Sequence, residues 1–201
     1  MSAFGMEGFG TMRAVEVDVY TAAYRVSGTV QTRFNRVAEI LNQLSGAHLA
    51  VEHATVSEHG EDGGTLGAPS VLVAVEHILL MAAAIPAGET ASEMRIPKRP
   101  VRAQLAIPPF RVTGNVHVPM GSRPVDGLLN VTERFLPMTD VTLASAAYPQ
   151  LERSAAVVAL RRERAHLLLV ADDERPDQLL AEILDERTAE AWLRGHGDQP
   201  G

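Results

Sequence analysis

The sequence contains an internal repeat, and this feature constrains the possible folds more than any other. A shift of 86 residues places 13–30 on 99–116, with six identical residues among eighteen aligned positions. Composition alone would give about one or two identities over such a length. The similarity continues in the same order, because 49–56 aligns with 136–143 after one extra residue in the second copy. The chain is therefore predicted to contain two copies of one structural unit.

Each copy is predicted to have the element order β-β-α-β-β-β. Alternating apolar and polar residues indicate strands with one solvated face, and the apolar spacing within 36–44 is typical of a short helix. Gly28 and Gly114 fall in the middle of the second strand of each copy, where glycine is typical of a bulge or a tight bend. Residues 60–69 are predicted to form a loop. The predicted strands span residues 15–19, 24–32, 48–57, 70–75 and 77–82 in the first copy and 101–107, 110–118, 136–145, 155–161 and 165–171 in the second.

A five-stranded sheet in a unit of about 70 to 75 residues is expected to curl into a small barrel or half-barrel, because closure hides its edges. We therefore predict a mainly β (α+β) fold of two tandem β-β-α-β-β-β small barrel-like domains, related by internal duplication and followed by a C-terminal helix. The predicted divisions are repeat 1 at 11–83, a linker at 84–98, repeat 2 at 99–172 and the C-terminal helix at 176–194.

Charge and cysteine content exclude several classes of function. The formal net charge is −7, so the chain does not attract a phosphate backbone through bulk charge. The absence of cysteine excludes disulfides, thiolate zinc sites, iron–sulfur clusters and cysteine nucleophiles. Residues 1–10 do not have the pattern of a secretory signal, and the longest apolar run, 78–86, is about half the length of a membrane span. We expect a cytoplasmic protein with no membrane partner.

The histidines give little support for a metal site. Neither a His-x-His pair nor a helical i, i+4 pair occurs among the seven, and His48 and His53 are expected to point to opposite faces of one strand. We predict no metal and no other cofactor, although a ligand role stays open as the alternative. His77 and His166 align at the starts of corresponding strands, which favours a shared turn contact over two catalytic bases.

One polar pattern, Arg-x-x-Glu/Asp followed by Asn, recurs in both predicted helices. In the structural interpretation, the acid pairs with the arginine one turn earlier and the asparagine terminates the helix. In the functional interpretation, the same groups bind a polar ligand or the backbone of a partner. The candidate binding residues are Arg36, Glu39 and Asn42 in the first copy and Arg123, Asp126 and Asn130 in the second.

Motifs for catalysis and for nucleic-acid binding are missing. The chain has no nucleophile elbow, no P-loop, no dinucleotide fingerprint and no H-E-x-x-H zinc motif. Basic residues cluster at 95–102 and 161–164, yet acidic residues lie nearby and stacking aromatics are lacking. We therefore predict no enzymatic activity and consider nucleic acid an unlikely partner.

The second copy resembles a family of small uncharacterised bacterial β-domains. The residues that carry the resemblance are 123–130 (Arg-Pro-Val-Asp-Gly-Leu-Leu-Asn) and 134–140 (Arg-Phe-Leu-Pro-Met-Thr-Asp), which are similar to the family pattern R-L-S-D-x-L-N followed by F-I-P-L-T. The first copy keeps the polar helix residues but has His-Leu-Ala-Val-Glu at 48–52 in place of the second segment. The resemblance covers about 12–82 and 99–171 and implies no known activity.

A more distant similarity concerns the order of features in the second copy. An acidic residue shortly before Leu-Asn, then a strand, then a basic turn at 161–164 leading into the apolar strand 167–170, is similar to the Sm-like small barrel. This is an analogy of fold, which does not determine function.

These observations together predict a non-catalytic binding or assembly module that acts through a protein partner or self-association. Duplication would provide two similar surfaces, and unpaired strand edges would permit strand addition. The main alternative is a regulatory protein that binds a small molecule in the crevice between the domains. The second alternative is an Sm-like protein that binds nucleic acid.

Overall fold

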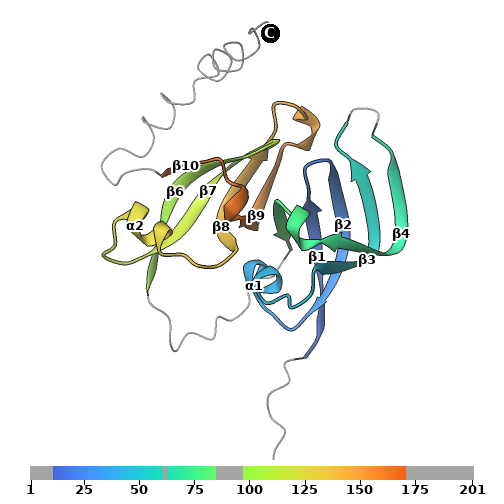
Figure 1. Ribbon diagram of the computed structural model, residues 1–201, viewed down its shortest axis with the longest axis horizontal. Coiled ribbons are helices and arrows are strands. Elements are labelled where there is room, and N and C mark those ends of the chain that lie inside the picture. The colour runs from blue at the N-terminus through green and yellow to red at the C-terminus, as the bar shows by residue number, and fades with distance from the viewer. Residues whose placement is uncertain (1–10, 61–62, 85–96, 171–201) are drawn as a thin grey trace, which may run out of the picture.

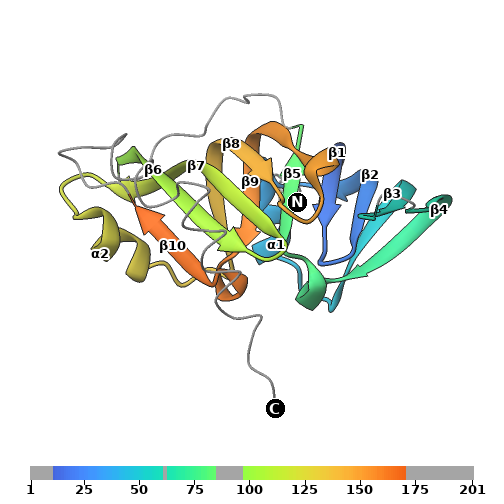
Figure 2. The same cartoon turned by 90° about the horizontal axis from the view of Figure 1, so that it is seen from above.

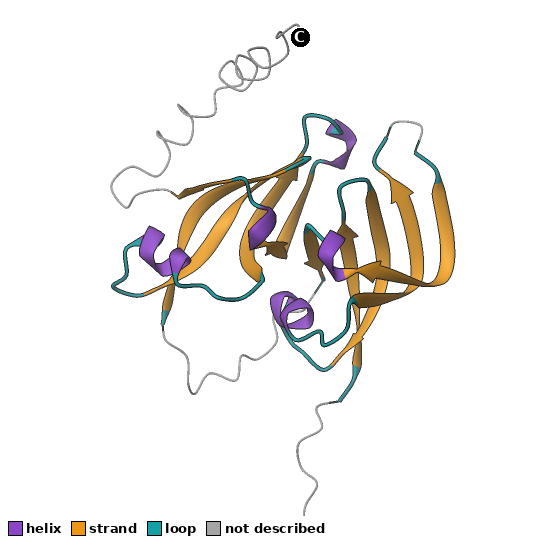
Figure 3. Ribbon diagram, viewed as in Figure 1, coloured by secondary structure: helices purple, strands orange, loops and turns teal. Residues whose placement is uncertain are grey.

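The computed structural model describes residues 11–60, 63–84 and 97–170 of the 201-residue chain (Figure 1). The predicted C-terminal helix at 176–194 and most of the predicted linker at 84–98 lie outside the described residues. Strands make up most of this part of the chain, and its helices are short (Figure 3). No helix within the described residues is long and apolar enough to cross a membrane.

Two halves of the chain have the same order of elements. Each half has two strands, a short α-helix, two strands, a 3₁₀ turn and a final short strand, and the second half has one additional 3₁₀ turn, η2 (Pro149–Leu151). The first half contains β1 (Arg13–Tyr20), β2 (Tyr24–Thr32), α1 (Val37–Asn42), β3 (His48–Glu58), β4 (Thr65–Ala74), η1 (Val75–His77) and β5 (Leu80–Ala83). The second half contains β6 (Lys98–Ile107), β7 (Phe110–Pro119), α2 (Pro124–Leu129), β8 (Phe135–Ala144), β9 (Arg153–Arg161), η3 (Arg162–Arg164) and β10 (Leu167–Val170).

All ten strands of the described residues form one open antiparallel sheet, in the order β10-β6-β7-β8-β9-β5-β1-β2-β3-β4. Figure 2 shows the row from β6 to β4, with β5 between β9 and β1. Within each half the final strand pairs with the first strand, so both halves have the strand order 5-1-2-3-4. The mainly β class agrees with the prediction.

The prediction of two separate small barrels is not confirmed. Closure of a barrel would place β5 against β4 of its own half, whereas the second edge of β5 pairs with β9 of the other half. The two halves thereby become one sheet. Within the described residues, this sheet ends at β10 on one side and at β4 on the other.

Each half has its own apolar core, and each core takes side chains from the other half. In β1, Val15, Val17 and Val19 are buried, as the alternating pattern predicts. Phe135 and Ala159 of the second half pack in the core of the first half. In return, the first half places Tyr20, Leu79 and Leu80 in the core of the second half.

The predicted bulges occur at both mid-strand glycines. The register between β2 and β3 shifts between Ser27 and Thr29, and the register between β7 and β8 shifts between Thr113 and Asn115. A Cβ atom at Gly28 would lie 2.5 Å from the carbonyl oxygen of Glu52. The backbones therefore approach too closely for a side chain at this position.

Several boundaries differ from the sequence prediction, and two of them, in the first half, have a clear physical reason. β4 begins at Thr65, inside the predicted loop 60–69, and it contains Gly67 and Pro69. These residues are compatible with a strand here because β4 pairs with β3 alone among the described strands, so one of its edges needs no ladder donor. The final strand of the first half begins at Leu80 instead of residue 77, because Val75–His77 form the turn η1.

Candidate interaction site

The two halves meet at a contact that we call the joint: β5 paired with β9, together with α1 packed against β8 and β9. Three residue pairs form its ladder, Leu80 with Leu160, Met81 with Ala159 and Ala82 with Val158. Next to them, the backbone N–H of Arg161 donates to the carbonyl of Leu79 at 2.8 Å. Because Met81 and Ala159 have no exposed surface, the centre of this short ladder is fully removed from water.

Asn42 attaches α1 to the other half of the chain. Its side-chain amide donates to the carbonyl of Phe135 at 2.9 Å, and its side-chain oxygen accepts from the Phe135 N–H at 2.9 Å. Phe135 is the first residue of β8 and is completely buried. The amide therefore satisfies both backbone groups of a buried residue at the start of a strand.

Arg161 forms a second polar connection across the joint. The guanidinium lies over the ring of Phe135, 5.9 Å from its centroid, and Nη1 donates to the carbonyl of Val75 at 2.7 Å. An ion pair with Glu163 at 3.3 Å occupies Nη2. Arg161 thus connects β9 with the turn η1 that precedes β5 of the first half.

An aromatic cluster lies at the end of the joint. Phe110 meets Tyr20 edge-on with a centroid distance of 5.7 Å, and His59 lies 5.4 Å from both Phe110 and Tyr148. Burial lowers the pKa of His59, opposed by its contact with the carbonyl of Thr21 at 3.1 Å. His59 is therefore a neutral packing residue of the joint at pH 7.

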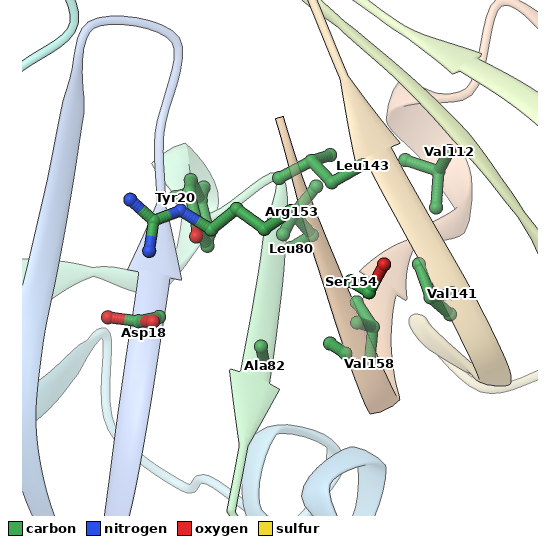
Figure 4. Close-up of a pocket in the computed structure, with 11 residues that line it drawn as sticks. Asp18, Tyr20, Leu80, Ala82, Val112, Val141, Leu143, Arg153, Ser154 and Val158 are labelled. Atoms are coloured by element: carbon green, nitrogen blue, oxygen red, sulfur yellow. The ribbon is translucent and has the colours of Figure 1, made fainter. Parts of the chain in front are cut away.

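A pocket of about 150 Å³ lies between the halves, where β9 separates from β1 and β5 (Figure 4). Its polar lining includes Asp18, Tyr20, Arg153 and Ser154. The Asp18 carboxylate is already bound by Arg25, through a bidentate contact at 2.8 and 2.9 Å. Burial, then the charge of Asp18, raises the pKa of Tyr20. Because the Tyr20 hydroxyl therefore keeps its proton at neutral pH, it offers the pocket a polar contact and not a catalytic base.

The six polar residues singled out from the sequence do not gather in one place. α1 lies between the halves, whereas α2 lies at the far side of the second half against β7 (Figure 1). Each helix has an exposed i, i+3 ion pair: Arg36 with Glu39 at 3.7 Å in α1 and Arg123 with Asp126 at 3.0 Å in α2.

The two asparagines of the pattern have different contacts. Asn42 reaches across the joint to Phe135, whereas Asn130 donates to the carbonyl of Asp126 within its own helix end at 2.9 Å. The contacts of the second helix follow the structural interpretation of the pattern. A binding role for the six residues stays a prediction.

The six histidines of the described residues do not form a metal-binding cluster. Within residues 11–60, 63–84 and 97–170, no three side chains of the ligating types His, Asp and Glu come together in a way that could hold a metal ion. The alignment of His77 with His166 is wrong, because the N–H groups of Leu79 and His166 make the corresponding bonds, to Tyr20 and Ala106. Leu79, and not His77, therefore corresponds to His166, and the final strands of the two halves align with a shift two residues smaller than the sequence predicted.

The joint residues Met81 and Ala159 were not singled out from the sequence. Their apolar character marks them as core, but a strand pattern does not indicate which edge meets which partner. The chain matches no protein-family model, no curated protein and no solved structure.

Proposed function

We propose that this chain is a non-catalytic assembly module, which binds polypeptide chains by strand addition at the two ends of its sheet. The observation that carries the proposal is the open sheet itself: among the described strands, β4 and β10 each have one edge without a partner. An unpaired edge offers a row of backbone donors and acceptors, to which an extended segment can bind.

Apolar exposure on β4 supports this function. Edge strands that avoid association are short, or have charged side chains or a proline. β4 has ten residues, none of them charged, and its proline, Pro69, precedes the segment 70–74, which contains no proline. Leu66 and Leu72, which lie on this strand, are 68% and 67% exposed. Such a strand is suited to pairing with another chain.

The two halves are also proposed to be copies of one duplicated unit. Their element order and strand order agree, and each has a glycine bulge at the same point of its second strand. In a duplicated unit each copy has a final-strand edge and a fourth-strand edge. Because the joint uses β5 and β9, one edge of each type is left, β10 at one end of the sheet and β4 at the other.

Synthetic peptides test strand addition directly. A peptide with the sequence of β9 (residues 153–161) is offered to the full-length chain at millimolar concentration, since β9 already pairs with the counterpart of β10. We expect slower hydrogen exchange in β10, with no change in the central strands β7 and β8. A scrambled peptide is the control. Equal exchange with both peptides would contradict strand addition at this edge.

The pocket between the halves favours a second candidate function, the binding of a small polar ligand. Arg153 lines the pocket, and its buried Nε has no hydrogen-bond partner among the described residues. Pockets for drug-sized ligands have volumes of about 300 to 1,000 Å³, so this one suits only a very small molecule. A thermal-shift screen with small anions tests it, because a native-state ligand raises the unfolding temperature. The shift should disappear in Arg153→Met.

A further inference from the structure

We propose that the partner at these edges is a second copy of the same chain, bound head to tail, with β10 of one copy pairing with β4 of the next. This inference rests on the proposed function and names the partner. Its basis is the joint, which already shows how the final strand of one half pairs with the fourth strand of another half. Here β5 and β9 are the counterparts of β10 and β4.

The register of the new pairing follows from the joint. In the first half Val19 lies opposite Met81, and in the second half Leu105 lies opposite Leu168. Val19 and Leu105 align in the internal repeat. Leu168 of β10 therefore occupies the position that Met81 has in β5.

The same comparison applies to the fourth strands. Leu49 lies opposite Val73, and its aligned residue Leu136 lies opposite Leu160. Val73 therefore corresponds to Leu160, and the neighbouring Leu72 corresponds to Ala159. Because Met81 pairs with Ala159 in the joint, the geometry places Leu168 of one copy directly opposite Leu72 of the next.

The solvent exposure of the side chains differs between the joint and the corresponding positions on the free edges of β4 and β10. Met81 and Ala159 are completely buried, whereas Leu168 and Leu72 are 38% and 67% exposed. Exposed leucines thus lie at the two free-edge positions that correspond to Met81 and Ala159, a pair that is completely buried in the joint. Burial of two leucines on assembly would remove apolar surface from water, which is the main favourable term in association.

Two further exposed side chains correspond to residues that are buried near the joint. Tyr24 is 45% exposed, and its aligned residue Phe110 is buried against Tyr20 of the other half. Val125 of α2 is 52% exposed, and its counterpart in α1, Ala38, is buried. Four of the seven exposed large hydrophobic side chains in the described residues therefore lie where a second joint would cover them.

A head-to-tail contact uses two different surfaces, so each copy keeps one free edge of each type. Such a heterologous contact generates a ring if the rotation closes and a filament if it does not. A contact between two identical edges, β4 with β4 or β10 with β10, would stop at a dimer. This difference makes the proposal testable with single substitutions.

Light scattering of the full-length chain over a concentration series is the first measurement. We expect wild-type masses above the 21.6 kDa of one chain, rising with concentration. Leu72→Glu and Leu168→Glu should each be monomeric, because either substitution places a charge in the centre of the new ladder. An equimolar mixture of the two variants should form a dimer, since each supplies the edge that the other lacks.

Matched controls separate assembly from folding. Met12 is another exposed hydrophobic residue, at 59%, and it lies directly before β1, a strand in the middle of the sheet. Met12→Glu should assemble as the wild type does. All three variants should keep the wild-type thermal unfolding temperature at low concentration, because substitutions of exposed side chains usually change stability very little.

A disulfide tests the register itself. The chain has no cysteine, and directly opposite residues of antiparallel strands have Cα separations that a disulfide can span. The double variant Leu72→Cys, Leu168→Cys should form a covalent ladder of multimers on oxidation. The control Leu66→Cys, Leu168→Cys, which is six residues out of register on β4, should not.

Several results would overturn the inference. A wild-type chain that stays monomeric at all concentrations and forms no disulfide ladder excludes head-to-tail assembly. Association that survives Leu168→Glu but not Leu72→Glu would instead indicate pairing of identical β4 edges. If the β9 peptide still protects β10 in a monomeric chain, strand addition stands and only the self-partner is wrong. If neither occurs, both proposals fail.

Discussion

Asn42→Ala is expected to weaken the joint more than any other single polar substitution described above. The substitution removes the amide that satisfies both the N–H and the carbonyl of Phe135. Each buried backbone group left without a partner costs about 1 to 3 kcal/mol. Asn42 itself is only half-buried, so water can replace part of the lost bonding. We therefore expect a loss of about 3 kcal/mol in the free energy of unfolding, near the lower end of the summed range.

Urea denaturation followed by circular dichroism measures this loss. With a urea slope of about 2 kcal/mol per M, the midpoint should fall by roughly 1.5 M. Asn130→Ala is the matched control, because its amide binds only the carbonyl of Asp126 at an exposed helix end, and it should cost less than about 1 kcal/mol. Asn42→Asp should remain close to the alanine variant, since a carboxylate can accept from Phe135 but cannot donate to it. Equal effects of the two alanine substitutions would refute the reasoning.

Two further predictions concern the glycine bulges and the buried histidine. Gly28→Ala should lower stability by about 3 kcal/mol and Gly114→Ala by less, because the added Cβ would meet a carbonyl oxygen at 2.5 Å in the first case and at 2.9 Å in the second. Gly67→Ala, where the added Cβ meets nothing within 4 Å, should lie within about 0.5 kcal/mol of the wild type in thermal unfolding. Burial lowers the pKa of His59 from 6.5, so the unfolded chain binds a proton first as the pH falls. The free energy of unfolding should therefore be highest above pH 6.5 and decrease below it, down to the folded pKa. His59→Gln should flatten that decrease in denaturation curves at pH 5 and pH 7.5. Burial also lowers the pKa of His117, so part of the decrease in stability should remain in His59→Gln. If the dependence of stability on pH is the same in His59→Gln as in the wild type, burial of His59 is not its cause.

The local structure of each half was predictable because it depends on residues close in sequence. Alternation along Val15, Val17 and Val19 indicates a strand with one buried face, and the valines are indeed buried. The glycine positions predicted the bulges for a steric reason that involves only neighbouring strands. The internal repeat made the prediction of the element order more secure, because the same order could be predicted separately from each half of the sequence.

The arrangement of the two halves was not predictable from these patterns. Periodicity indicates which face of β5 is buried, yet it does not indicate which strand occupies its second edge, since backbone hydrogen bonds carry no side-chain signature. We expected closure within each half, whereas Met81 is covered by Ala159 of the other half. The sequence predicts a strand that begins too late, because the run from Gly60 to Pro69, with Gly63 and Gly64 at its centre, is typical of a loop. In the structure Gly67 and Pro69 are part of β4, where they are tolerated because β4 lies at the end of the sheet.

In the candidate site too, contacts between residues close in sequence were predictable and contacts between distant residues were not. The ion pairs of Arg36 and Arg123 involve residues one helical turn apart, so spacing alone indicated them. The contact between Asn42 and Phe135 joins residues 93 positions apart, and no local pattern distinguishes Asn42 from Asn130. Leu72 and Leu168 could be recognised as counterparts of the buried joint residues only from the structure, because the recognition depends on comparing their exposure with the burial of Ala159 and Met81.

The exchange of core residues between the halves also affects how the chain folds while it is being synthesised. The first half ends with β5 at Ala83, but its core includes Phe135 and Ala159. A ribosome adds about 5 to 20 residues per second. About 4 to 16 seconds therefore pass between the synthesis of β5, the last strand of the first half, and the completion of β9. During that interval the edge of β5 and the inner face of α1 are open to water and to neighbouring nascent chains. Translation speed through residues 84–161 thus sets how long an incomplete core is exposed in every newly made molecule.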